Sequence, residues 1–225
     1  MRQVNLDSTK QTYVDAFFQY HRRRAERLLE LWGQGHQDDA LTLCCCYLDG
    51  LASFAYYCSH RSAYNFVALL REHGAEPELS LCSPLALIRW MEGQGGWRKV
   101  ASGKLRVALG TTITTLISDK NLEGLLKAHL PHRDFQRLTS DIWRASVAYI
   151  AYERLRNPFV HQLGGPGAVI VTSATVTDKE VAIDFPVLHQ ALLRALDHFE
   201  SVSRKTGRWL VMISSHDHGR CLRCA

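Results

Sequence analysis

Apolar side chains recur every three or four positions over most of the chain, which is the spacing of amphipathic helices. Residues 9–31 carry the first stripe, and the two glycines within residues 32–35 predict its end. A second helix is expected to start near Asp38. Its body, residues 41–58, is apolar on almost every side and rich in small residues, which favours the centre of a helical bundle. Asp49 is the only charged residue in that body.

The middle third of the chain has weaker patterns. Short helices are predicted over residues 62–74 and 84–91, the second opened by a proline. Residues 92–104 are rich in glycine and basic side chains and predict a mobile loop, while residues 111–117 fit either a helix or a strand.

The most regular stripe follows Pro131 and predicts one long helix. Its members alternate strictly by three and four: Phe135, Leu138, Ile142, Ala145, Tyr149 and Tyr152. Arg156 is the next position of this stripe. Asn157 and Pro158 then favour a kink, followed by a short turn that carries His161.

The period changes to two over residues 168–185, which predicts a two-stranded hairpin. A final amphipathic helix is expected from residue 186 to about 205. The predicted fold class is therefore mainly α, with a small β-hairpin insertion near the C-terminal helix. We expect one domain over residues 1–225, with a core at about 10–205 and a tail at 206–225.

Composition excludes several classes of protein. Hydrophobic residues make up 46% of the chain and charged residues 22%, which is typical of a globular domain. No apolar run is long enough to span a bilayer, and the N-terminal residues lack the apolar core of a signal peptide. Seven cysteines, three of them adjacent, do not resemble a disulfide framework. We therefore expect a cytoplasmic protein that does not contact a membrane.

The strongest chemical signal is the cluster of Arg156, Asn157 and His161. A buried arginine is costly unless a polar or charged group satisfies it, and the kink lets the three side chains converge. They suit RNA cleavage: His161 for proton transfer, Arg156 for stabilising charge on phosphorus, and Asn157 for positioning the 2′-hydroxyl or orienting the histidine. Asp49 either pairs with Arg156 or His161 across the helix pair, or is a core charge that fixes helix register.

Residues 156–161 resemble the R-x4–6-H motif of the HEPN (higher eukaryotes and prokaryotes nucleotide-binding) domain family, with a polar residue directly after the arginine. The small-residue helix around Asp49 and the helix preceding Arg156 resemble the core helical pair of that family. The resemblance implies an antiparallel helical bundle and a homodimer whose two motifs meet at a composite cleft. It also implies a metal-independent endoribonuclease of a toxin–antitoxin or antiphage system, with Arg156, Asn157 and His161 as its catalytic set and no cofactor. Two features are not typical of the family: the long segment at about 75–130 and the predicted hairpin.

Other family members have lost catalysis, so a non-catalytic module that binds a nucleotide or a partner protein is the alternative function. RNA and an antitoxin or other regulatory protein are the expected partners. Two basic segments could contact RNA phosphates or could be solvated surface: the first-helix cluster of Arg22, Arg23, Arg24 and Arg27, and the 92–104 segment with Arg98, Lys99 and Lys104.

The last residues of the chain offer a possible zinc site. Four donors of the right type are His216, His218, Cys221 and Cys224. They are crowded into nine residues with no second pair of ligands, so a frayed tail is the preferred interpretation and no metal is expected.

Overall fold

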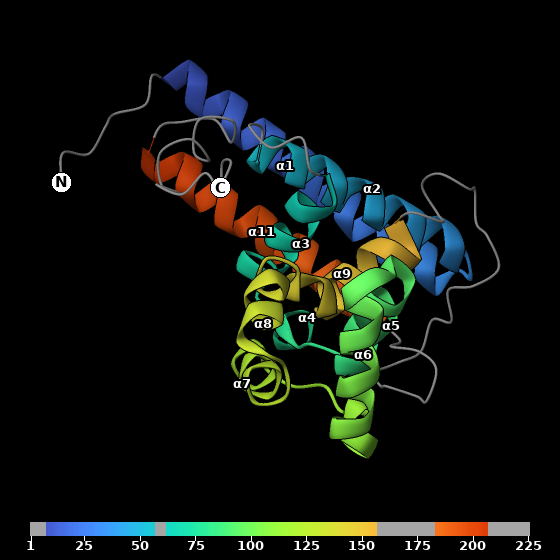
Figure 1. The fold of residues 1–225 in the computed structure, drawn as a ribbon. Coiled ribbons are helices and arrows are strands. Elements are labelled where there is room, and N and C mark those ends of the chain that lie inside the picture. Colours follow the sequence, from blue (N-terminus) through green and yellow to red (C-terminus); the bar gives the residue numbers. More distant parts are fainter. Residues whose placement is uncertain (1–7, 57–61, 157–182, 207–225) are drawn as a thin grey trace. The chain divides into compact units, whose positions relative to one another are not determined.

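The computed structural model describes residues 8–56, 62–156 and 183–206 (Figure 1). Every regular element in these ranges is a helix, so the prediction of a mainly α fold is confirmed. Most of the expected hairpin, residues 168–182, lies outside the described residues. Its last position, Phe185, was assigned wrongly, because it is the first residue of the C-terminal helix. Within the described ranges the only β-type pairings are two isolated bridges, and there is no sheet.

The chain divides into two compact units. Unit 1 comprises Met1–Glu76, Leu155–Gly165 and Phe185–Ala225, and unit 2 comprises Pro77–Arg154 and Pro166–Asp184. The single domain expected from the sequence stays a prediction. In the described part of the chain, no helix is both long enough and apolar enough to cross a membrane.

The described residues of unit 1 form four helices: α1 (Ser8–Gly33), α2 (Gln37–Ala55), α3 (Ser62–Glu72) and α11 (Phe185–Thr206). Helix α1 packs against both α2 and α11, and α2 packs against α3 (Figure 1). The predicted stripe of α1 is buried, and Phe18 and Leu28 lie in the core. The predicted stop is also confirmed, because α1 ends at Gly33 and Gly35 takes a positive φ of 87°. Helix α2 ends at Ala55, earlier than residue 58.

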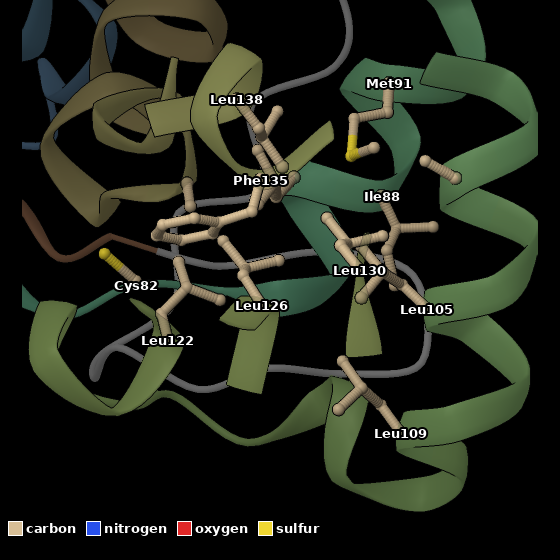
Figure 2. Packing of buried hydrophobic residues seen from close by; sticks show 13 residues of the cluster. Cys82, Ile88, Met91, Leu105, Leu109, Leu122, Leu126, Leu130, Phe135 and Leu138 are labelled. Carbon is tan, nitrogen blue, oxygen red and sulfur yellow. The ribbon is translucent and has the colours of Figure 1, made fainter. Parts of the chain in front are cut away.

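Unit 2 is a succession of shorter elements. In its described residues the α-helices are α4 (Pro77–Ser80), α5 (Pro84–Gln94), α6 (Gly96–Leu109), α7 (Asp119–His129), α8 (His132–Thr139) and α9 (Val147–Ala151). Two 3-10 helices, η1 (Gly110–Thr114) and η2 (Ile142–Ala145), lie between them, and a π-helical turn, η3 (Tyr152–Arg156), follows α9. Figure 2 shows the core of this unit, where Ile88 and Met91 of α5 meet leucines of α6, α7 and α8.

The loop predicted over residues 92–104 is wrong, because most of it belongs to α6. Gly95 and Gly96 have positive φ angles of 69° and 57°, so they end α5 and start a new helix instead of opening a loop. Beyond them Ala101, Leu105 and Leu109 bury one face of α6. The glycines and cations masked this short apolar face in the sequence.

The single long helix predicted after Pro131 is also wrong, because it is divided into α8, η2, α9 and η3. The backbone at residues 145–147 bonds to another segment: Ser83 N donates to Ala145 O and Val147 N donates to Leu81 O, both at 2.8 Å. Ser146 Oγ then accepts a hydrogen bond from Tyr149 N and caps α9. The apolar stripe is nevertheless buried on both sides of this break.

Candidate functional site

Arg156 is the last residue of the π-helical turn η3, which follows α9 directly. Its exposed fraction is only 8%, as expected for a position on the buried stripe. A π-helical turn is a rare insertion in a helix, and such turns are often found where a side chain has to be placed for function.

Asp49 of α2 holds the guanidinium of Arg156. Arg156 Nη2 donates to Asp49 Oδ2 at 2.8 Å, and the side chains of Arg156 and Asp49 are 10% and 21% exposed. This is one of the two pairings expected for Asp49 from the sequence, and it is confirmed. The second oxygen, Asp49 Oδ1, is buried and accepts no hydrogen bond from the residues that the structure describes. The ion pair therefore leaves part of the carboxylate unsatisfied, and the catalytic roles of both residues stay predictions.

The other members of the predicted site lie outside the described residues. These are Asn157 and His161, which complete the catalytic set, and the tail donors His216, His218, Cys221 and Cys224. Within residues 8–56, 62–156 and 183–206, no group of three or more His, Cys, Asp or Glu side chains is placed to hold a metal ion.

The arginines of α1 fall into three situations. Arg22 donates to Asp197 and Glu200 of α11, so its charge clamps two helices together. Arg24 donates to the hydroxyl of Tyr47 at 2.6 Å and to that of Tyr20, and its guanidinium lies 5.6 Å and 5.2 Å from the centroids of these two rings. Arg23 and Arg27 are exposed. The predicted RNA contact is untested for all four.

The adjacent cysteines of α2 are poor nucleophiles. Burial raises the pKa of the Cys44 thiol well above its ordinary value and raises the pKa of Cys45 to about 12. Both therefore remain protonated thiols at neutral pH. Cys46 is exposed, and its pKa is raised by partial burial and by the negative charge of Asp49.

A small hollow lies between α1, α2 and α11. It has a volume of about 70 Å³, and its lining includes Phe17, His21, Cys46, Tyr47, Phe54 and Leu192. Burial and the nearby Arg24 lower the pKa of His21. This hollow was not predicted from the sequence, although His21, a histidine on an otherwise apolar helix stripe, is the signal that could have found it. No family model, no curated protein and no solved structure matches the chain.

Proposed function

We propose that the protein is a metal-independent endoribonuclease of the HEPN type, which cleaves RNA by attack of a 2′-hydroxyl on the adjacent phosphate. The observation that carries this proposal is the buried ion pair of Arg156 and Asp49. Arg156 lies five residues before His161 in the sequence. The resemblance of residues 156–161 to the family motif supports it.

The pair suits a phosphate site because the guanidinium is already held in place. An arginine tied by a carboxylate loses little side-chain entropy when it meets a phosphate, and its planar fork matches two phosphate oxygens. Such preorganised charge is most effective where negative charge grows in the transition state. In this mechanism Arg156 stabilises the five-coordinate phosphorus, His161 transfers protons, and Asn157 positions the 2′-hydroxyl. The products are a 2′,3′-cyclic phosphate and a free 5′-hydroxyl.

The wider parts of the proposal rest on the family resemblance alone. They are an antiparallel HEPN bundle, a homodimer with a composite cleft, and a cytoplasmic role as a toxin or antiphage effector. An antitoxin or other regulatory protein is the proposed partner. Light scattering at micromolar concentration tests the dimer, and one chain per particle would remove the basis of the composite cleft.

The experiment that tests the activity uses three proteins in excess EDTA: the wild type, His161→Ala, and His36→Ala as the matched control. His36 is an exposed histidine between α1 and α2. Single-stranded and structured RNA are incubated with each, and the ends of the products are identified. We expect the wild type and the His36 variant to leave 2′,3′-cyclic phosphate ends, and the His161 variant to lose at least about 100-fold in rate, as the loss of a general acid–base group predicts. Cleavage that survives in the His161 variant would contradict the mechanism.

A second function is favoured by the same ion pair. Asp49 already neutralises the charge of Arg156. A buried ion pair of this kind can have a purely structural role, which is to fix the register of two helices. The protein would then be a non-catalytic module that binds a nucleotide or a partner protein. Absence of cleavage of any RNA by the wild type would favour this function.

A further inference from the structure

Unit 2 carries a cluster in which tryptophan rings are in contact with arginine guanidiniums. The guanidinium carbons of Arg98 and Arg144 lie 5.4 Å and 5.0 Å from the ring centroid of Trp90 in α5. Those of Arg98 and Arg137 lie 5.0 Å and 5.8 Å from the ring centroid of Trp97 in α6. These distances are within the range of cation–π attraction, so the side chains tie α5, α6, α8 and η2 together.

The three arginines of this cluster differ in whether a carboxylate neutralises them. Asp141 accepts hydrogen bonds from Arg98 Nη2 at 3.1 Å and from Arg144 Nε at 3.3 Å. Arg137 is exposed, and it forms no ion pair or hydrogen bond with any residue that the structure describes. The first two arginines therefore have a structural role, whereas Arg137 has donors that it can offer to a ligand.

Helix α6 adds positive charge on the side of Trp97. It contains two lysines and two arginines and no Asp or Glu. Lys104 comes seven positions after Trp97 and so lies on the same side of α6; it is exposed and has no ion pair among the described residues. Arg133 comes four positions before Arg137 and extends the exposed side of α8 in the same way. We call Trp97, Lys104, Arg133 and Arg137 the basic face of unit 2.

The chemistry of the basic face favours the phosphates of a nucleic acid backbone. Guanidinium and ammonium groups are the usual donors to phosphate oxygens. Asp134 also belongs to α8, but it forms no ion pair with Arg133 or Arg137. An acidic protein is disfavoured, because the aromatic anchor that its interface would bury is already in contact with two guanidiniums at Trp97.

A duplex fits the basic face better than a single strand. Recognition of a single strand depends on the stacking of its bases on aromatic side chains, and the guanidiniums over Trp97 compete with such stacking. A duplex is recognised by its shape and its phosphates, which need cations at fixed positions. The contact with Trp97 restricts the guanidinium of Arg137 in this way.

We infer that the basic face of unit 2 binds the phosphate backbone of duplex RNA and selects RNA with double-stranded segments, whatever their base sequence. The choice of RNA rests on the function proposed above. The basic face belongs to unit 2, whereas the Arg156–Asp49 pair belongs to unit 1. Binding of the duplex and cleavage are therefore assigned to different residues and can be lost separately.

Fluorescence anisotropy with the full-length protein tests this inference. The probe is a labelled RNA duplex of about 20 base pairs, longer than the roughly 16 that a duplex-binding domain typically spans. Its strands carry 2′-O-methyl groups, which keep the phosphates but remove the hydroxyl that cleavage requires. Affinity is measured between about 50 and about 200 mM salt, because each phosphate contact adds about 0.9 to the slope of log affinity against log salt. We expect duplexes of two unrelated sequences to bind equally within about twofold, and the single strand to bind more weakly.

Matched variants locate the contact. Lys104→Gln and Arg137→Gln should each reduce the slope by about 1, so that each variant loses about 3- to 4-fold less affinity than the wild type over this range of salt. Arg106→Gln is the control, because Glu92 already neutralises Arg106 through both carboxylate oxygens. Arg106 also comes nine positions after Trp97 and so lies on the opposite side of α6. This variant should leave the slope unchanged, and circular dichroism checks that all three variants fold.

Three results would overturn the inference: slopes of the Lys104 and Arg137 variants that equal the wild-type slope, equal affinity for the single strand, or displacement of the duplex by poly-glutamate at the same concentration of charge. The last would identify an acidic protein as the occupant. Failure of this inference is distinguishable from failure of the ribonuclease. Duplex binding with the expected slopes, without cleavage of any RNA, would refute the ribonuclease alone. Cleavage by the wild type, with unchanged slopes in the variants, would refute the basic face alone.

Discussion

Loss of the Asp49 charge should destabilise the protein strongly, because it removes a carboxylate that pairs with a buried arginine. The change Asp49→Asn keeps the shape of the side chain and an oxygen that faces Arg156, but removes the charge. The Arg156 side chain is 10% exposed, so its guanidinium cannot recover full hydration. Breaking a buried pair costs about 3–5 kcal/mol, and because Asp49 is 21% exposed we expect the lower end, about 3 kcal/mol. Urea unfolding followed by circular dichroism measures this change.

An exposed ion pair at the start of α2 provides the control. His36 and Asp39 approach to 4.0 Å with side chains 59% and 75% exposed, so Asp39→Asn should cost less than about 1 kcal/mol. Replacing Asp49 and Arg156 together by leucine and methionine should recover most of the loss, because no isolated charge then remains buried. If Asp49→Asn lay within about 0.5 kcal/mol of the wild type, the reasoning that this pair is buried and coupled would be refuted.

Three further changes test the packing. Ser146→Ala removes the cap of α9 and should lower the free energy of unfolding by about 1 kcal/mol; an unchanged urea midpoint would contradict the capping role. Gly74→Ala would press a methyl group against the Leu70 carbonyl oxygen and should destabilise by about 1–3 kcal/mol, whereas Gly103→Ala, which meets nothing within 4 Å in α6, should not lower the melting temperature. Burial lowers the pKa of His189 below its ordinary 6.5, so its contribution to stability is complete above that value and is lost as pH falls through the lowered folded pKa. Urea unfolding at about pH 7.5 and pH 5.5 should show a smaller loss for His189→Gln than for the wild type, and equal losses would exclude His189 as the source.

The sequence predicted α1 and α11 well, because each carries a long apolar stripe that its neighbours bury. Helix α1 and its glycine stop, and α11 with its bounds near 186 and 205, needed only local patterns. The pairing of Asp49 with Arg156 was one of the alternatives that the sequence left open, beside a pairing with His161 and a core charge that fixes helix register.

The prediction of one long helix after Pro131 was wrong for a reason that local sequence patterns could not reveal. The stripe itself continues through the breaks at Asp141 and Ser146, so its period could not reveal them. The helix is interrupted where its backbone forms a hydrogen bond with a segment that is distant in the sequence, from Val147 N to Leu81 O. The hollow was missed similarly, because Phe17 and Cys46 meet only when α1 and α2 are packed together.

The antiparallel contact of residues 81–83 with residues 145–147 has a consequence for how the chain tolerates change. It joins the beginning and the end of the long segment Pro77–Arg154, through the bridge between Cys82 and Ser146. A segment whose ends are held side by side acts as a short connection for the rest of the chain. Contacts within the segment offset the entropy that is lost when its two ends are brought together. An insertion or deletion in a surface connection between these ends then leaves unchanged the gap that the flanking helices have to close.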